Sequence, residues 1–540
     1  MSSVLESPRD NAVTLIDALL AEQRSLTAVA RFARKHEEHA LPAQARFYRD
    51  LIPLTKPAPG EQYAFEVDLD QCTGCKGCVT ACHSLNGLDD EESWRSVGLL
   101  LGGLNGEALQ QTVTTACHHC VDPGCLNGCP VLAYEKDPLT GIVRHLDDQC
   151  IGCQYCVMKC PYDVPKYSER LGIVRKCDLC HQRLAVGEAP ACVQACPNEA
   201  IKVTLANPSS LTAAYRGAGA RENPFLAASP APDYTLPTTI YKTQRPQVAT
   251  LRAADETALK PQPAHWPLVF LLVLSQASVG GATGAWLAAA AGQSFAATRL
   301  VMLSVVLLAV ALGIGTLHLG RPAKAWRVFL GWRRSWFSRE AIAFGGYFGA
   351  ASLAATMIVS GRGTGAELKV LMAAAALLGF VSVFCSLMLY VDTRREFWSL
   401  FHTGTRFVGS TALLGLAAWL VTVSGEPTIP NAALFALIAV ALVKLACEST
   451  VLRHRRESHW TPLKRTARLL LGRLRIALGL RIALALLGGV VLPGAAILGL
   501  LPSSLVTTAS LVLLLAGELA ERYLFFTAVS PTQMPGGLAA

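Results

Sequence analysis

The chain has 540 residues, of which 52% are hydrophobic and only 16% carry a charge, so it is too long for one core and too apolar for an ordinary soluble protein. Its formal net charge is +9. The excess of Lys and Arg falls largely in short loops between apolar segments, which is typical of a membrane protein and argues against nucleic-acid binding.

Residues 1–60 are expected to form a helical extension. Apolar residues recur twice at helical spacing, which predicts two short amphipathic helices, with Val13, Leu15, Ile16, Leu19 and Leu20 in the first and Leu26, Val29, Ala30 and Phe32 in the second. The opening MSSVLESPRDNAV shows neither a signal-peptide pattern nor a twin-arginine pair. Two roles remain open: an extension that packs on the next domain, or an arm that docks to a partner subunit.

Residues 61–205 contain sixteen of the 18 cysteines, in four groups of four: Cys72, Cys75, Cys78 and Cys82; Cys117, Cys120, Cys125 and Cys129; Cys150, Cys153, Cys156 and Cys160; Cys177, Cys180, Cys192 and Cys196. The first and third groups have the spacing C-x2-C-x2-C-x3-C of two-cluster ferredoxins, in which three close thiolates hold one cubane and the fourth reaches its neighbour. The other two cysteines, Cys385 and Cys447, stand in apolar runs and are expected to pack as small hydrophobic residues.

Structural zinc is the alternative for any close pair of cysteines. A zinc site rarely needs a third cysteine two residues further on and a fourth three beyond it, so this fourfold repetition favours iron–sulfur chemistry. Sixteen ligands suffice for four cubanes, which predicts four [4Fe–4S] clusters and no [3Fe–4S] cluster. The expected fold of this region is α+β and ferredoxin-like.

Residues 206–265 are rich in Pro, Ala, Ser and Thr without sustained periodicity, which predicts an extended linker or strap over the domain surface. Residues 266–540 are expected to form an all-α transmembrane anchor, because each apolar run approaches the 20 or so residues that span a bilayer. We expect about eight spans, near 267–290, 299–317, 340–360, 368–391, 406–424, 431–451, 475–496 and 503–526. The seventh is the weakest, because Arg473, Arg475 and Arg481 crowd its start.

A quinone is the natural electron partner of a membrane-anchored cluster protein, because it is lipid-soluble and exchanges electrons together with protons. Its site needs a proton acceptor near the membrane boundary. His318, at the end of the second span, and Glu340, at the start of the third, meet this need on the face that carries the iron–sulfur domain. The plainer alternatives are a histidine that interacts with a helix C-terminus and a carboxylate that satisfies free N–H groups at a helix start.

Other polar residues of the anchor are given weaker roles. Second-tier quinone candidates at the same face are Arg321, Tyr390, Asp392 and Arg394. Near helix ends, where long side chains are expected to snorkel to water, stand Lys444, Glu448, Glu518, Glu521 and Arg522. Haem b is not expected, because it needs paired histidines within the spans, whereas those of the anchor lie in loops or at span edges: His265, His318, His402, His454 and His459.

The basic residues of the short loops predict the orientation. Seventeen are expected on the side of the iron–sulfur domain: Arg321, Lys324, Arg327, Arg333, Arg334, Arg339, Arg394, Arg395, Arg406, Arg453, Arg455, Arg456, Lys464, Arg465, Arg468, Arg473 and Arg475. Only Arg299, Arg362 and Lys369 are expected on the opposite side. This bias places the iron–sulfur domain in the cytoplasm, on the inner membrane of the cell.

Two sets of motifs carry a family resemblance. CIGCQYCVMKCPYDVPKY and KCDLC…ACVQACP resemble the electron-transfer subunit of the dimethyl sulfoxide reductase family of molybdenum enzymes, and related subunits of nitrate and polysulfide reductases. HLGRPAKAWR, SWFSRE, YVDTRREFW and GELAERYLFF resemble the membrane anchor of that family. Nitrate-type members have a tryptophan in place of one cysteine of the second group, whereas this chain keeps Cys120.

The resemblance implies that the cysteine groups share clusters crosswise. Four ligand sets follow from it: Cys72, Cys75, Cys78 and Cys196; Cys82, Cys177, Cys180 and Cys192; Cys129, Cys150, Cys153 and Cys156; Cys117, Cys120, Cys125 and Cys160. It also implies that the histidine and glutamate of the anchor motifs, His318 and Glu340, belong to a quinol site.

The resemblance further implies a fused electron-transfer and anchor subunit rather than a complete enzyme. It would pass electrons between the quinone pool, as ubiquinone or menaquinone, and a separate subunit with Mo-bis(molybdopterin guanine dinucleotide), or Mo-bis(MGD). A cytoplasmic iron–sulfur domain departs from the best-known family members and favours a sulfite dehydrogenase type. The alternatives are a redox-driven ion-translocating module, which would need ionisable residues through the bundle, and a scaffold for cluster assembly.

Overall fold

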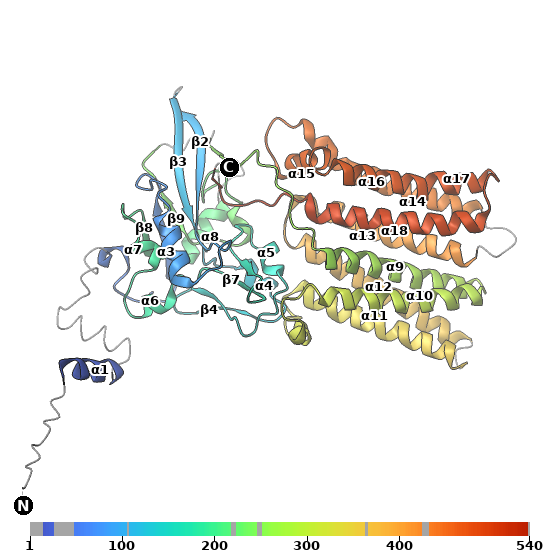
Figure 1. Cartoon of the computed structure of the whole chain (residues 1–540), viewed down its shortest axis with the longest axis horizontal. Helices are drawn as coiled ribbons and strands as arrows, with labels where there is room; N and C mark the ends of the chain where they lie inside the picture. The colour runs from blue at the N-terminus through green and yellow to red at the C-terminus, as the bar shows by residue number, and fades with distance from the viewer. Residues whose placement is uncertain are drawn as a thin grey trace, which may run out of the picture.

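The computed structural model describes residues 14–25, 48–104, 107–217, 223–245, 251–361, 365–423 and 431–537. Small sheets and short helices form a head, made of residues between 48 and 265, at one end of a bundle of long helices between 266 and 527 (Figure 1). Within these described ranges, eight helices are long and apolar enough to cross a membrane. The prediction of an α+β head followed by a bundle of about eight helices is therefore confirmed.

Two three-stranded sheets and two hairpins build the head. The first sheet has the order β8-β1-β9 and the second β10-β2-β3. The strands are β1 Gln62–Asp68, β2 Ser96–Leu104, β3 Glu107–Thr115, β4 Tyr134–Lys136, β5 Val143–His145, β6 Lys166–Ser168, β7 Ile173–Arg175, β8 Ile201–Ala206, β9 Ile240–Lys242 and β10 Arg252–Ala253. Phe65 and Val67 of β1 are buried in the main core of the head, because alternate strand residues point to one face.

Short helices of the head begin or end at the cysteine groups. They are α3 Gly77–Asn86, α4 Gly124–Gly128, α5 Tyr155–Lys159, α6 His181–Ala185 and α7 Ala191–Gln194. In each of the four C-x-x-C turns or directly after it, at least one residue other than glycine has a positive φ, such as Lys76 at 62°, His119 at 41°, Gln154 at 58° and Leu179 at 60°. Such left-handed turns allow successive backbone N–H groups to converge on an anionic group.

Residues 206–265 are more structured than the predicted strap. They contain α8 Pro208–Gly217 and a short 3₁₀ helix, Pro232–Tyr234. They also supply β9, which pairs in parallel with β1, and β10, which pairs antiparallel with β2. These strands have only two or three residues, too few for a periodic pattern to reveal them.

Residues 529–537, beyond the last span, return to the head. The Gly536 carbonyl accepts a hydrogen bond from the Leu99 N–H of β2 at 3.0 Å. Asp255 accepts hydrogen bonds from the Gly536 N–H at 3.0 Å and from the Gln533 amide at 2.8 Å. Met534 is buried in the main core of the head. This return segment was expected to belong to the anchor alone.

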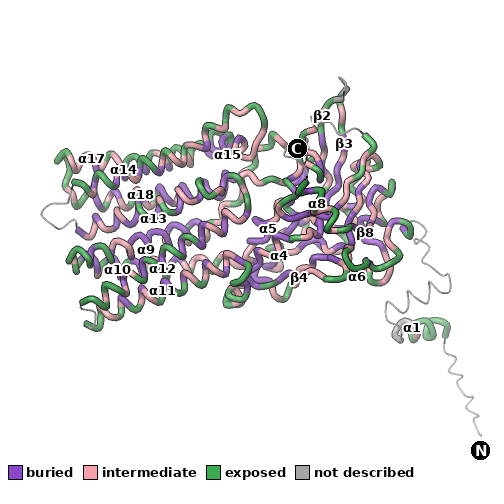
Figure 2. The backbone as a smooth tube through the Cα atoms, turned by 180° about the vertical axis from the view of Figure 1, so that it is seen from behind, coloured by how far each residue is buried: buried purple, intermediate pink, exposed green. Residues whose placement is uncertain are grey.

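The first of the two predicted N-terminal helices is present as α1, Leu15–Ser25. Its apolar residues Leu15, Ile16, Leu19 and Leu20 are exposed, as the tube drawing also shows for α1 (Figure 2). The second predicted helix, with Leu26 to Phe32, lies outside the described residues. The choice between a packing extension and a docking arm remains a prediction.

The bundle consists of α9 Trp266–Ala290, α10 Ser294–Thr316, α11 Trp336–Val359, α12 Ala366–Val391, α13 Leu400–Thr422, α14 Asn431–Ser449, α16 Arg475–Leu486 with its continuation to α17 Leu492–Ile497, and α18 Ser503–Thr527. Several spans begin earlier than predicted, because the helix continues past a charged residue that interrupts the apolar run, such as Arg299 or Arg406.

Between α9 and α13 the backbones approach closely: a Cβ on Gly280 would lie 2.7 Å from the Cα of Gly415. Small residues at such crossings are a general means of helix packing in membranes.

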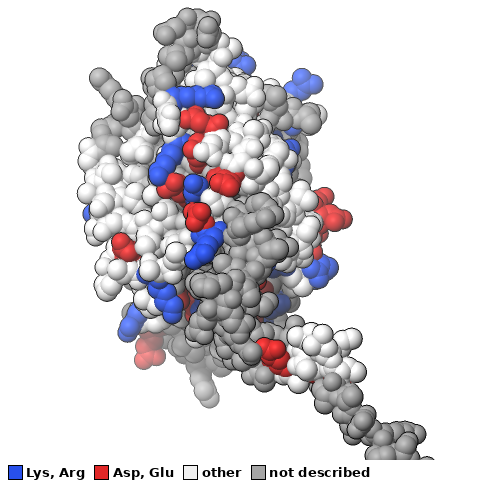
Figure 3. Space-filling view, turned by 90° about the vertical axis from the view of Figure 1, so that its left-hand side faces the viewer, with Lys and Arg blue, Asp and Glu red and all other residues white. Residues whose placement is uncertain are grey.

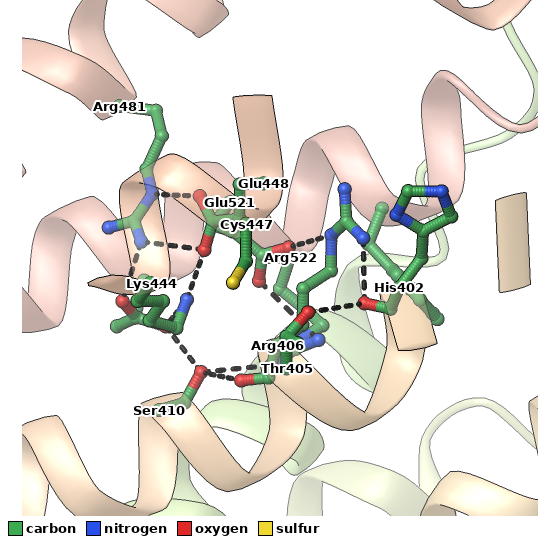
Figure 4. A network of polar contacts seen from close by, with 12 residues as sticks. His402, Thr405, Arg406, Ser410, Lys444, Cys447, Glu448, Arg481, Glu521 and Arg522 are labelled. Carbon is green, nitrogen blue, oxygen red and sulfur yellow. Dashed lines mark hydrogen bonds and ion pairs between the residues drawn. The ribbon is translucent and has the colours of Figure 1, made fainter. Parts of the chain in front are cut away.

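A network of charged side chains lies inside the bundle, between α13, α14, α16 and α18 (Figure 4). Its members were in part expected to snorkel, and that prediction is wrong. Lys444 and Arg481 bind Glu518 at 3.0 and 2.9 Å, and Arg406 binds Glu521 at 2.9 Å. Glu448 pairs with both Lys444 and Arg481, and Arg522 with Glu521. These side chains face neighbouring helices rather than lipid, so they satisfy one another instead of reaching water.

Candidate functional site

The structure brings the sixteen cysteines of the head together in four sets, which we number from 1 to 4. The thiols of each set lie close enough to interact electrostatically. Set 1 is Cys72, Cys75, Cys78 and Cys196; set 2 is Cys82, Cys177, Cys180 and Cys192; set 3 is Cys117, Cys120, Cys125 and Cys160; set 4 is Cys129, Cys150, Cys153 and Cys156. This is the crosswise arrangement that the family resemblance implies.

The surroundings of the sets fit cubane clusters. The four thiols of set 1 line one common cavity, and so do those of set 3. Among the described residues no group of three or more Cys, His, Asp or Glu side chains is placed to hold a single metal ion. Backbone N–H groups point at the sulfurs, as from Ala133 to Cys129 at 3.2 Å and from Ala200 to Cys196 at 3.3 Å. Such hydrogen bonds favour the thiolate that binds iron.

The four sets follow one another from the outside of the head to the bundle. Cys75 of set 1 is exposed. Cys78 of set 1 interacts with Cys192 of set 2, and Cys177 of set 2 with Cys117 of set 3. Between sets 3 and 4 stands the buried ring of Tyr134, in reach of thiols from both sets. Set 4 adjoins the anchor, because Cys153 lines a cavity at the end of the bundle that faces the head.

Glycine backbones form the joint between set 4 and the anchor. Gly320, in the loop after α10, lies against Gly152 and Gly172, so closely that a Cβ on Gly320 would stand 2.2 Å from the Gly172 carbonyl oxygen. Gly152 has a φ of +70° in the turn of set 4. Next to this contact the Arg321 N–H donates to the Ile151 carbonyl at 3.1 Å. The joint therefore fixes the anchor loop directly against the turn that carries Cys153.

We expect Gly320→Val to separate the head from the anchor. The added side chain has no space between two backbones, so either the loop or the turn must move. Electron transfer between the head and the anchor should slow about tenfold or more, and the head should lose its contacts with the anchor at a lower denaturant concentration. Gly346→Val in α11, where nothing lies within 4 Å of an added Cβ, is the matched control. Wild-type kinetics and stability in Gly320→Val would contradict the assigned joint.

A cavity of about 170 Å³ lies where the head meets α9, α10, α11 and α12. Its walls are mostly apolar, with a few polar groups that converge on it. The head contributes Ile151, Cys153, Tyr155 and Met158; the anchor contributes, among others, Leu268, Leu271, Leu312, His318, Glu340, Phe344 and Tyr390. An apolar pocket with few placed polar groups is typical of a small-molecule site.

His318 lies beside the backbone of Cys153, and its ring meets that of His265 edge to face at a centroid distance of 5.2 Å. Burial, and then the neighbouring His265, lower the pKa of His318 to about 4, so the ring is neutral at neutral pH. Its Nε2 is buried without a hydrogen-bond partner in the described part of the chain. A buried unpaired nitrogen is costly, which suggests that a bound molecule satisfies it.

Glu340 and Tyr390 complete the polar side of the cavity. Glu340 lies in the first turns of α11 and is only 6% exposed, next to Ser386 of α12. Tyr390 lies near the end of α12 and is buried against Trp398, Phe407 and other aromatic rings. The structure thus brings together the first two quinone candidates and one of the second tier.

The other second-tier candidates do not line this cavity. Arg321 joins the anchor loop to the head. The Asp392 carboxylate accepts a hydrogen bond from the Lys159 ammonium at 2.6 Å, and Arg394 pairs with Asp233 at 3.6 Å, so both fasten α12 to the head. Sequence reasoning missed Tyr155, whose hydroxyl donates to the Leu389 carbonyl at 2.9 Å. Its place between Cys153 and Cys156 was the available signal.

The comparisons with known proteins agree with both halves of the molecule. A family model described as a 4Fe-4S dicluster domain matches residues 110–205, and one described as the DMSO reductase anchor subunit matches residues 262–528. The B subunit of the anaerobic dimethyl sulfoxide reductase of Haemophilus influenzae is 39% identical over 150 residues, which are 26% of this chain and 73% of that protein. The corresponding B subunit of Escherichia coli K12 is 41% identical over 148 residues, or 26% and 72%. The protein belongs to the dimethyl sulfoxide reductase family.

This dimethyl sulfoxide reductase family member unites an iron–sulfur part and a membrane anchor that match separately described family components. It is a multi-pass membrane protein with an electron-transfer head. The likeness of the head extends further, to the iron-sulfur subunit of the nitrate-inducible formate dehydrogenase of Escherichia coli K12, with 34% identity over 168 residues, which are 27% of this chain and 57% of that protein.

Proposed function

We propose that this chain conducts electrons between a separate molybdenum subunit and the membrane quinone pool through four [4Fe–4S] clusters, one in each cysteine set. One observation carries the proposal: Cys153 of set 4 lines the same cavity as His318 and Glu340. A quinone in this cavity lies beside the innermost set, so no haem is needed between them.

Quinol oxidation in this cavity releases two electrons and two protons. The clusters supply one-electron transfer, so the two electrons leave one after the other. Glu340 is placed to accept a proton, and the unpaired Nε2 of His318 is placed to form a hydrogen bond with an oxygen of the quinol. Ubiquinone and menaquinone share the two ring oxygens that these groups address. The reverse reaction uses the same groups, so the direction follows from the partner's substrate.

The partner subunit is proposed to bind at set 1, whose Cys75 is exposed. The visible part of the head's far end carries acidic and basic side chains intermixed, without a broad field of one sign (Figure 3). Such a surface suits a protein partner better than a nucleic acid. The names of the two B-subunit relatives support a catalytic subunit of the dimethyl sulfoxide reductase type, which we propose to hold Mo-bis(MGD).

Metal analysis of the anaerobically purified protein tests the cluster number. Four cubanes predict about sixteen iron and sixteen sulfide per chain. Added quinol should bleach the visible absorption of the clusters, and a molybdenum subunit should co-purify. Zinc in place of iron, or iron and sulfide far below this number, would refute the proposal.

The loop charges support an inner-membrane protein with a cytoplasmic head, which makes a sulfite dehydrogenase type attractive. Of the counted residues, Arg406 lies inside the bundle rather than in a loop, and Arg362 lies outside the described residues. The remaining excess of basic residues in the loops on the side of the head still favours a cytoplasmic head. Protease added to intact cells should leave the head uncut, whereas protease added to inverted vesicles should cleave it. Cleavage in intact cells would reverse the orientation.

The charged network inside the bundle favours one second candidate, an ion-translocating module. Against it, the rings of Tyr390, Phe407 and Phe525 stand between the cavity and Arg522. The two phenylalanine rings carry no exchangeable proton, so they interrupt a proton path from Tyr390 to Arg522. Quinol oxidation in sealed vesicles should therefore release about two protons per quinol and pump none; additional pumped protons would favour the second candidate.

A further inference from the structure

Two buried cations stand between successive cysteine sets. Arg95 and Lys176 are only 2% and 3% exposed, although they carry long charged side chains. Their charged neighbours are chiefly thiols. Burying a cation without a paired carboxylate is unfavourable in an apolar interior, so their positions call for anions that the cysteine sets provide.

Arg95 lies between sets 1 and 2. Its guanidinium interacts with Cys78 of set 1 and with Cys82, Cys177 and Cys192 of set 2. One nitrogen donates to the Thr114 hydroxyl at 3.2 Å, and another, Nη2, is buried without a partner among the described residues. The face of the guanidinium covers the Phe65 ring at 4.6 Å.

Lys176 lies between sets 2 and 3. Its ammonium is 3.6 Å from the Cys117 sulfur of set 3 and donates to the carbonyl of Cys177, the set 2 ligand next to it, at 2.9 Å. The Val143 carbonyl accepts a further hydrogen bond. The ammonium therefore lies directly between a thiol of set 3 and the backbone of set 2, with no carboxylate as its hydrogen-bond partner.

Between sets 3 and 4 no such cation was found in the described head. The neutral ring of Tyr134 stands there, near Cys125 of set 3 and Cys156 of set 4. A buried cation therefore lies between sets 1 and 2 and another between sets 2 and 3, whereas none was found between sets 3 and 4 in the described head. Set 2 thus lies between Arg95 and Lys176, whereas Lys136 and Arg395 approach set 3 at Cys120 and Cys160, away from the row.

We propose that Arg95 and Lys176 are shared counter-charges that raise the reduction potentials of sets 1, 2 and 3, and leave set 4 unaffected. Four thiolates around a cubane give it a net negative charge, and each added electron increases that charge. A fixed cation in a low-dielectric interior favours the added electron, and cluster potentials respond to such local charge. The inference rests on the proposed four-cluster function.

Potentiometric titration of the complete membrane complex, followed by electron paramagnetic resonance, tests this proposal. Arg95→Gln should lower two of the four midpoint potentials, those of sets 1 and 2; Lys176→Gln should lower those of sets 2 and 3. We expect each reduction equilibrium to change at least tenfold, which is 59 mV for one electron. In the double variant three potentials should fall, one of them by about the sum of both shifts, and the fourth should stay unchanged.

The conservative variants separate charge from structure. Arg95→Lys and Lys176→Arg keep the charge and should restore potentials close to those of the wild type. Lys242→Gln removes an exposed cation of β9, which pairs with Glu66 in reach of water, and should leave all four potentials unchanged.

The outcomes distinguish this inference from the proposed function. A wild-type protein without four clusters would refute the function itself. Four intact clusters whose potentials do not move in either Gln variant would overturn only the role of the two cations. Loss of clusters from both Gln variants, with complete clusters in Arg95→Lys and Lys176→Arg, would assign the cations to assembly and would equally overturn the proposal.

Discussion

Glu340→Gln should slow quinol-driven reduction of the clusters about 100-fold or more. The amide has the same size as the carboxylate, yet it cannot accept the proton that quinol oxidation releases, and a positioned proton acceptor contributes roughly 100- to 10,000-fold. His318→Ala should have an effect in the same direction, because it removes the unpaired Nε2 from the cavity wall. Stopped-flow absorption of the anaerobic protein after mixing with quinol measures both rates.

Matched controls lie outside the cavity in the same protein. Glu367→Gln, at the exposed start of α12, and His459→Ala, in an exposed loop, make the same chemical changes away from it. Both should keep wild-type rates, and all four variants should keep their iron. Rates within twofold of the wild type for both Glu340→Gln and His318→Ala would show that quinol reacts elsewhere.

Arg481→Leu should destabilise the bundle by about 3–5 kcal/mol, the usual cost of removing one partner from a buried ion pair. Arg481 binds two carboxylates, Glu448 and Glu518, and both side chains would stay buried with less positive charge beside them. Thermal unfolding of the detergent-solubilised protein should shift down by roughly 10 °C or more.

Two comparisons make this result specific to the network. Arg475→Leu removes an exposed arginine six residues earlier on the same helix and should have little effect. The double variant Arg481→Leu with Glu518→Leu removes one charge of each sign and should recover part of the lost stability. A stability of Arg481→Leu equal to that of Arg475→Leu would mean that water reaches the network.

The cysteine pattern carried most of what the sequence could predict. The first and third cysteine groups have the spacing of a tight cluster-binding loop. A long apolar run in lipid is stable as a helix, because only then are its backbone groups hydrogen-bonded within the segment. His318 and Glu340 were found because a polar residue at a membrane boundary stands out against apolar neighbours. That the first and fourth cysteine groups share clusters could be predicted only from the family resemblance. Spacing along the sequence does not show which distant cysteine completes each ligand set.

The residues that sequence reasoning misplaced act through contacts between distant parts of the chain. Glu518 and Lys444 looked like snorkelling side chains, because their proximity to a helix end is visible and the partner across the bundle is not. Asp392 looked like a pocket residue, but its partner Lys159 lies more than 200 positions earlier. Gly320 carries no chemical group at all, so only its contact with Gly172 reveals its role.

The return of residues 533–536 to β2 has a consequence for biosynthesis. The ribosome completes the cysteine-bearing region long before these residues emerge, and all eight spans are made in between. The sheet edge at Leu99 and the carboxylate of Asp255 therefore wait for the last span to be inserted. A polypeptide that stalls in the membrane would therefore keep this edge of the head uncovered.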